Sequence, residues 1–159
     1  KTAYEMLRSL VGSEMCIRDS PIIEDTIAFM DSKSIPYQLE IASAHRTPNK
    51  LEKIILDAKR YDIKVIIAIA GFAAHLPGVI ASKTLIPVIG VPVASSPLGG
   101  IDALFSIVQM PPGIPVATMG VGKSGAKNAV LYSLQILSLN DKDYKSILNE
   151  YRKSFGDID

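Results

Sequence analysis

The sequence has few of the residues that build disulfide bonds, metal centres and nucleic-acid-binding surfaces. Its 159 residues include one cysteine and two histidines, which excludes an internal disulfide and a cysteine-cluster zinc site. Seventeen basic and sixteen acidic residues leave a net charge of +1, without the basic bias typical of nucleic-acid-binding proteins. We therefore expect no metal, no disulfide and no nucleic acid.

Long hydrophobic runs are also missing. The longest apolar run extends from Val65 to Ala74, about half of the 20 residues that a transmembrane helix needs. The length is that of a single domain, and the mean hydropathy of +0.25 is high for a soluble monomer. We therefore expect a cytoplasmic globular protein without membrane contact, whose excess apolar surface closes a subunit interface.

From residue 21 on, segments typical of helices alternate with segments typical of strands. Strands are expected at residues 37–42, 64–70, 87–91 and 116–119. Helices are expected at residues 21–33, from 48 on, 77–83, 101–109, 126–139 and after a cap at Asn140. Strands separated by such helices predict a parallel α/β sheet with helices on both faces. We expect one domain over residues 21–159.

Residues 1–20 do not follow this alternation. Residues 3–8 favour a helix, and residues 11–18 show no clear period. We interpret the segment as foreign to the fold, such as translated adaptor sequence. An unusual natural extension is the alternative.

Parallel sheets bind ligands where the carboxyl ends of strands meet helix N-termini, and both histidines fall in such loops. Residues 43–48 read Ser-Ala-His-Arg-Thr-Pro; Arg46 suits a phosphate or carboxylate, and His45 suits proton transfer near neutral pH. Residues 71–78 combine small residues with His75, so a ligand could approach the backbone closely. The alternative for residues 43–48 is a capped helix with an exposed His-Arg pair. The alternative for residues 71–78 is a tight strand-to-helix connection in which His75 is structural.

Two other features are weaker candidates. Residues 122–124 read Gly-Lys-Ser, but the phosphate-loop motif needs a glycine five positions before Gly122, and Ala117 stands there. Nucleoside triphosphate binding is therefore not expected. The lone Cys16 has no base near it in sequence, so it is not expected to be a nucleophile.

Five blocks of sequence follow one another along the chain: residues 43–48, 73–78 (Ala-Ala-His-Leu-Pro-Gly), 87–93 (Pro-Val-Ile-Gly-Val-Pro-Val), 106–111 (Ser-Ile-Val-Gln-Met-Pro) and 113–117 (Gly-Ile-Pro-Val-Ala). Together they closely resemble the N5-carboxyaminoimidazole ribonucleotide mutase family of de novo purine synthesis. The resemblance extends from about residue 21 to about residue 139. The block at 73–78 looks like the mutase type rather than the related carboxylase that uses free carbon dioxide.

The resemblance implies a three-layer αβα sandwich of the flavodoxin or Rossmann type, assembled as a homo-octamer with sites near subunit contacts. The substrate would be a ribonucleotide with an unstable carbamate, whose carboxylate moves to a ring carbon without cofactor, metal or ATP. His45 would move the proton, and Arg46 would hold the phosphate. The other substrate-binding residues implied are Asp19, Ser43, Ala44, Gly71, Ala74, His75 and Leu76.

The sequence also departs from the family. Where the family has Gly-Ser-x-Ser-Asp, Asp19 matches the aspartate, but Met15, Cys16 and Arg18 replace the glycine and serines. The family's first strand has no convincing counterpart. Glycine is usual in the family at positions 69 and 72, where this chain has isoleucine and phenylalanine, and Lys127 replaces a small residue.

Three alternatives to an active mutase therefore stay open. The first is a catalytically impaired oligomeric nucleotide-binding homologue, which would bind substrate without turnover. The second is the carbon-dioxide-dependent aminoimidazole ribonucleotide carboxylase, which added bicarbonate would reveal. The third is a generic flavodoxin-like module, which flavin absorbance would reveal.

Overall fold

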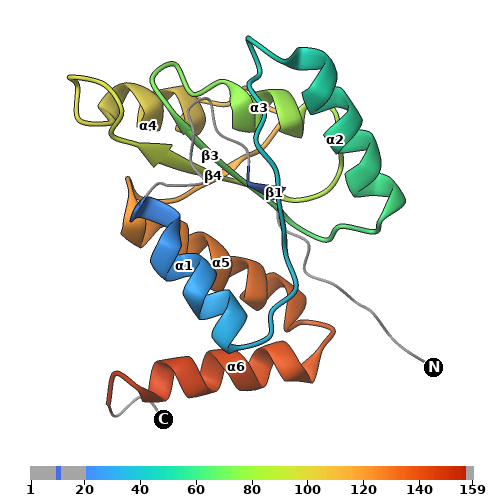
Figure 1. The fold of residues 1–159 in the computed structure, drawn as a ribbon, viewed down its shortest axis with the longest axis vertical. Helices are drawn as coiled ribbons and strands as arrows, with labels where there is room; N and C mark the ends of the chain where they lie inside the picture. Colours follow the sequence, from blue (N-terminus) through green and yellow to red (C-terminus); the bar gives the residue numbers. More distant parts are fainter. Residues whose placement is uncertain (1–9, 12–20, 157–159) are drawn as a thin grey trace.

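The computed structural model describes residues 10–11 and 21–156 (Figure 1). The strands are β1 (Leu10–Val11), β2 (Gln38–Leu39), β3 (Ile66–Gly71), β4 (Val88–Val93) and β5 (Ala117–Thr118). The helices are α1 (Pro21–Ser32), α2 (Pro48–Arg60), α3 (Leu76–Ala81), α4 (Ile101–Val108), α5 (Lys123–Leu137) and α6 (Lys142–Lys153). Helices and strands alternate as the sequence predicts.

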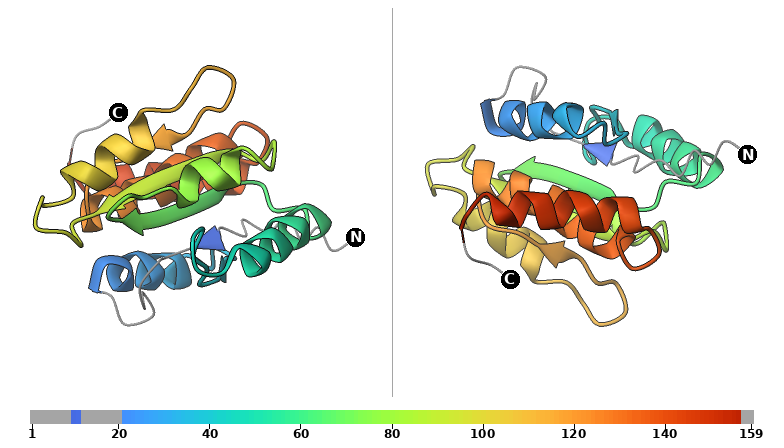
Figure 2. Two further views of the ribbon diagram at one scale, coloured as in Figure 1. Left: turned by 90° about the horizontal axis from the view of Figure 1, so that it is seen from above. Right: turned by 90° about the horizontal axis from the view of Figure 1, so that it is seen from below.

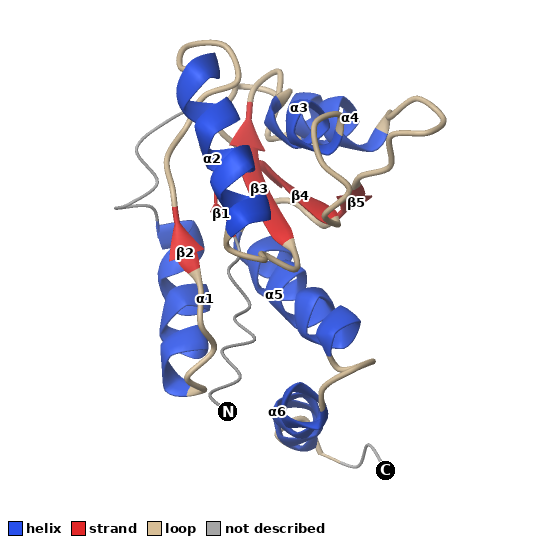
Figure 3. Ribbon diagram, turned by 90° about the vertical axis from the view of Figure 1, so that its right-hand side faces the viewer, coloured by secondary structure: helices blue, strands red, loops and turns tan. Residues whose placement is uncertain are grey.

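Every strand pair is parallel. β3 and β4 pair over six residues, from Ile66 opposite Val88 to Gly71 opposite Val93. β5 pairs with β4, and β1 pairs with β2. The hydrogen-bonded pairs form two sheets, β1-β2 and β3-β4-β5. Because β1 also lies against β3, the strands follow one another in space in the order β2, β1, β3, β4, β5 (Figure 3).

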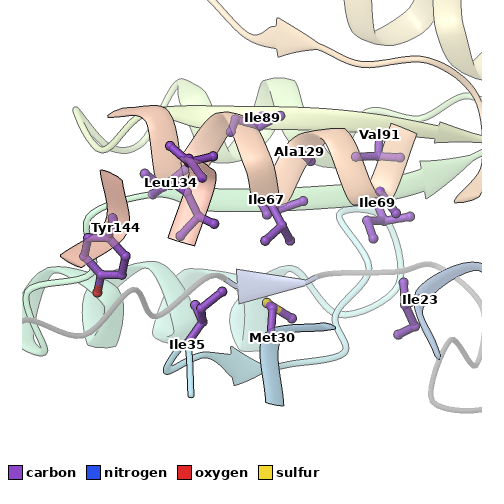
Figure 4. Packing of buried hydrophobic residues seen from close by; sticks show 14 of the residues in the cluster. Ile23, Met30, Ile35, Ile67, Ile69, Ile89, Val91, Ala129, Leu134 and Tyr144 are labelled. Carbon is purple, nitrogen blue, oxygen red and sulfur yellow. The ribbon is translucent and has the colours of Figure 1, made fainter. Parts of the chain in front are cut away.

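Helices lie on both sides of the sheet, which makes three layers, with α2, α3 and α4 on one side and α1, α5 and α6 on the other (Figure 1). Seen from above and below, α1, β1 and α2 lie in one band beside β3 and β4 (Figure 2). Ile67 and Ile69 of β3 pack with residues of α1, α5 and α6, and Figure 4 shows them facing Ile23 and Met30 of α1. Ile66 and Ala68 point the other way, into a core shared with α2, α3 and α4. The predicted α/β sandwich is therefore confirmed, and its central strands are apolar throughout because both of their faces are buried.

The structure corrects several predicted boundaries. α5 begins at Lys123, three residues before the expected start, because Gly122 takes a left-handed φ of 81° at the N-cap. Asn140 is not the cap of α6; the Asp141 carboxylate accepts the Asp143 N–H at 2.8 Å instead. β2 and β5 are only two residues long, shorter than the strands expected at residues 37–42 and 116–119.

Leu10–Val11 is a strand that the sequence pattern does not predict. Its two residues pair in register with Gln38 and Leu39 of β2. A strand of two residues is too short to show the alternation of apolar and polar residues that is typical of strands, so the sequence does not predict it. The other predicted features of residues 1–20 lie outside the described residues.

Parallel strands place the loops after β2, β3, β4 and β5 at one edge of the sheet. These loops are residues 40–47, 72–75, 94–100 and 119–122. No helix within residues 21–156 is long and apolar enough to cross a bilayer. In the same part of the chain, no three histidine, cysteine or acidic side chains gather in a way that could hold a metal ion.

Candidate active site

The loop after β2 is held by a compact set of hydrogen bonds. The Ser43 N–H donates to Thr47 Oγ1 at 2.8 Å, and the Ser43 Oγ accepts the Arg46 N–H at 3.0 Å. The Ser43 carbonyl accepts the Thr47 N–H at 3.1 Å. Ser43 is buried, so its side chain shapes the turn, and the turn presents His45 and Arg46 to solvent. Thr47, which the sequence marks as the residue before a proline-started helix, also holds this turn through its hydroxyl group.

The loop after β3 is anchored by close packing. A Cβ on Gly71 would lie 2.5 Å from the Ser95 Oγ, so a glycine is needed where this loop meets the one after β4. Ala74 and Leu76 lie in the core cluster beneath the loop, and Leu76 has no exposed surface. Phe72 and His75 are exposed. Of the predicted pocket residues in this loop, His75 is therefore the one with an accessible side chain.

The two histidines meet across these loops. His45 Nε2 lies 2.7 Å from His75 Nδ1, and the rings are edge-to-face with centroids 4.9 Å apart. One nitrogen must donate and the other accept. Two imidazolium rings would both be donors, so this hydrogen bond needs an unprotonated nitrogen on one of the two rings. The sequence placed both residues in equivalent loops, but it did not reveal this contact.

Arg46 adds positive charge next to the pair. It lies between His45 and the start of α2 and is exposed. Among the described residues, no carboxylate lies within ion-pair distance of its guanidinium. Ala44 is half-buried in the same turn. The edge of the sheet therefore combines a proton-carrying pair with a forked cation suited to phosphate.

Two departures from the family lie away from this edge. Ile69 is 2% exposed and packs in the core facing α1 and α5 (Figure 4). The Lys127 Nζ lies 4.1 Å from the centroid of the Phe29 ring and donates to the Asp25 carbonyl at 3.3 Å. Burial lowers the pKa of Lys127, while the nearby Asp25 raises it. Neither side chain belongs to the four loops, whereas Asp19, Met15, Cys16 and Arg18 lie outside the described residues.

Phe72 is the departure that lies at the edge itself. Its φ of 53° is left-handed, a conformation that costs a residue with a Cβ about 1–2 kcal/mol. We expect Phe72→Gly to be more stable than Phe72→Ala by about 1 kcal/mol, because both lose the ring but only glycine relaxes the backbone. That difference corresponds to about 2–4 °C in Tm for a domain of this size. Equal denaturant midpoints for the two variants would contradict it.

Comparison with known proteins gives the relationship directly. A model of the family described as AIR carboxylase matches residues 10–157. The chain belongs to the AIR carboxylase family. The family resemblance predicted from the sequence blocks is thereby confirmed, and the match includes the strand at Leu10–Val11.

Members of the AIR carboxylase family are similar to this chain over most of their length. The N5-carboxyaminoimidazole ribonucleotide mutase of Bacillus subtilis (strain 168) is 53% identical over 149 residues, covering 93% of this chain and 92% of the relative. The mutase of the same name from Escherichia coli (strain K12) is 54% identical over 124 residues, covering 78% and 73%. A crystal structure of Treponema denticola PurE superimposes with a TM-score of 0.75 at 27% identity, covering 92% of this chain and 89% of that one.

Proposed function

We propose that the chain is a cytoplasmic N5-carboxyaminoimidazole ribonucleotide mutase of purine biosynthesis. It would convert that substrate to 4-carboxy-5-aminoimidazole ribonucleotide. The observation that carries the proposal is the His45–His75 contact of 2.7 Å next to the exposed Arg46. The names of the relatives in Bacillus subtilis and Escherichia coli support the reaction.

His45 acts as the acid and the base. As an imidazolium it protonates the carbamate nitrogen. The bond between this nitrogen and the carboxyl carbon then breaks, which releases carbon dioxide and gives a neutral amine. The ring carbon then attacks carbon dioxide, and neutral His45 takes the proton displaced from that carbon. His45 gives one proton to nitrogen and takes one from carbon, so it ends in its starting protonation state. The reaction therefore needs no oxidant, reductant or second acid.

His75 positions the imidazole ring of His45. Its Nδ1 is within hydrogen-bond distance of His45 Nε2, which fixes one nitrogen of the catalytic ring and orients its plane. Recapture of carbon dioxide depends on proximity, because the free molecule diffuses away. The small residues after β3 allow close approach of the substrate to the backbone at this point.

Arg46 binds the phosphate of the nucleotide in this proposal. We expect Arg46→Gln to raise KM by about 10–100-fold, because a hydrogen bond to a charged group contributes about 1.5–3 kcal/mol. The effect on kcat should be smaller, because the phosphate is bound equally in the ground state and the transition state. Steady-state kinetics on the purified variant measure both.

Arg60→Gln is the matched control. Arg60 is exposed at the other end of α2, over the ring of Tyr61, and its loss changes the net charge equally. The control should leave KM unchanged. Equal increases in KM for both variants would mean that overall charge, and not a phosphate contact, sets the affinity.

The carboxylase reaction is the second candidate, because the matching family is described as AIR carboxylase. Substrate labelled with ¹³C in the carbamate distinguishes the two reactions in unlabelled bicarbonate. A mutase retains the label in the carbon-carboxylated product. A carboxylase instead forms unlabelled product from bicarbonate, at a rate that rises with the bicarbonate concentration. That result would contradict the mutase proposal and support the carboxylase.

The proposal includes a homo-octamer. Leu98, Ile101, Phe105 and Val108 are large apolar side chains spaced three and four residues apart, and each is about half-exposed or more. Ile101, Phe105 and Val108 form a stripe along α4, and Leu98 extends it into the loop after β4. Such a stripe suits burial against another copy of the chain. Light scattering should give the mass of an assembly, and a monomeric mass would contradict this part of the proposal.

A further inference from the structure

Phe72 is an unusual residue for its position. Among the described residues of the loops after β2, β3, β4 and β5, it is the only phenylalanine, tyrosine or tryptophan. It is 43% exposed and belongs to neither core cluster. An apolar ring of this size is therefore partly exposed, and outside both core clusters of the described residues, in one of the loops that carry the histidine pair.

Phe72 also lies in the same loop as His75. Phe72 and His75 are three residues apart, so their Cα atoms are at most about 10 Å apart. His75 contacts His45 directly. The start of the loop is fixed, because Gly71 is buried against Ser95. The loop that places Phe72 at this edge therefore also carries one of the two histidines.

The other groups at this edge serve other parts of a nucleotide. Arg46 offers charge for a phosphate, and the histidines offer a proton. The face of a planar heterocycle calls for a flat apolar surface. We propose that Phe72 packs against the imidazole face of the bound ribonucleotide and makes the site selective for a planar base.

This inference rests on the proposed function for the identity of the ligand. It also accounts for the backbone at position 72. A left-handed φ favours glycine, and strained conformations of this kind gather at ligand-binding positions. A phenylalanine held there at φ 53° is explained when its ring contributes to binding.

Three variants test the role of the ring at constant backbone strain. Phe72→Ala removes it, Phe72→Leu keeps apolar bulk without a flat face, and Phe72→Tyr keeps the flat face. We expect Phe72→Ala to raise KM for N5-carboxyaminoimidazole ribonucleotide about 3–10-fold, with kcat nearly constant. Phe72→Leu should recover part of the loss, and Phe72→Tyr nearly all of it.

Calorimetric titration provides a readout that a structural role would not move. The Kd for 5-aminoimidazole ribonucleotide should rise about 3–10-fold in Phe72→Ala, whereas the Kd for ribose 5-phosphate, which lacks the base, should not change. Equal weakening of both ligands would mean a collapsed loop and would overturn the inference. Affinities within twofold of the original protein, with or without a changed oligomeric mass, would overturn it too.

The two proposals fail separately. A protein that binds the nucleotide without converting it contradicts the proposed function, while the contrast between the two ligands still decides the role of Phe72. Normal conversion with unchanged KM in Phe72→Ala contradicts only the inference. A protein that binds neither ligand contradicts both.

Discussion

Replacing His45 by asparagine should lower kcat by about 10²–10⁴-fold, the range in which general acid–base catalysis contributes. Asparagine preserves a polar group of similar size but cannot gain or lose a proton near neutral pH. The pair with His75 would be broken at the atom that lies 2.7 Å from its Nδ1. Because His45 is exposed in a turn held by Ser43 and Thr47, the fold should tolerate the change. Initial rates of carbamate consumption and product formation provide the measurement.

Control measurements separate lost chemistry from lost structure. The His45→Asn protein should keep its sedimentation behaviour, its unfolding midpoint and its affinity for 5-aminoimidazole ribonucleotide. The chain has two histidines, so the imidazole ¹⁵N spectrum of the original protein reports on this pair alone. A variant that keeps the full rate would refute the assignment of His45 as the acid and base.

The second large effect should come from Gly125, in the first turn of α5. A Cβ there would collide with the carbonyl group of Gly120 and would lie 3.3 Å from the Val91 Cγ1. The colliding group is backbone, so no side chain can rotate away. We expect Gly125→Ala to lower the free energy of unfolding by about 2–3 kcal/mol, even though alanine favours a helix by about 1 kcal/mol. Thermal unfolding should show a loss of about 4–12 °C in Tm.

Gly120 offers the matched control for this substitution. It lies opposite Gly125 in the same contact, but a Cβ on Gly120 would meet nothing within 4 Å. Gly120→Ala should therefore leave the unfolding midpoint nearly unchanged. If the two alanine variants were equally stable, the close approach of α5 to the loop after β5 would not be what requires Gly125.

The fold was largely predictable because its elements carry strong local signals. The apolar run from residue 65 became the buried strand β3, and Thr47-Pro48 marked the start of α2. Leu10–Val11 left no such signal, since its strand depends on pairing with β2 rather than on its own pattern. α5 begins three residues before the predicted start at residue 126, because Gly122 takes the N-cap position.

The candidate site was less predictable than the fold. Loop position and residue type pointed to His45, Arg46 and His75, but distances between segments 30 residues apart depend on tertiary packing. The same dependence explains why Leu76, a predicted substrate-binding residue, is fully buried in this chain. The effects of Ile69 and Phe72 could not be separated from sequence either; one packs in the core, and the other is exposed at a left-handed position.

The central claim is that this chain performs the mutase reaction with His45. The most direct test is to incubate the protein with N5-carboxyaminoimidazole ribonucleotide, without ATP or added bicarbonate, and to follow the carbon-carboxylated product. The account predicts product formation well above the uncatalysed rate, and its loss in His45→Asn. Nucleotide binding without product would contradict the account and identify the chain as a binding homologue of the mutases.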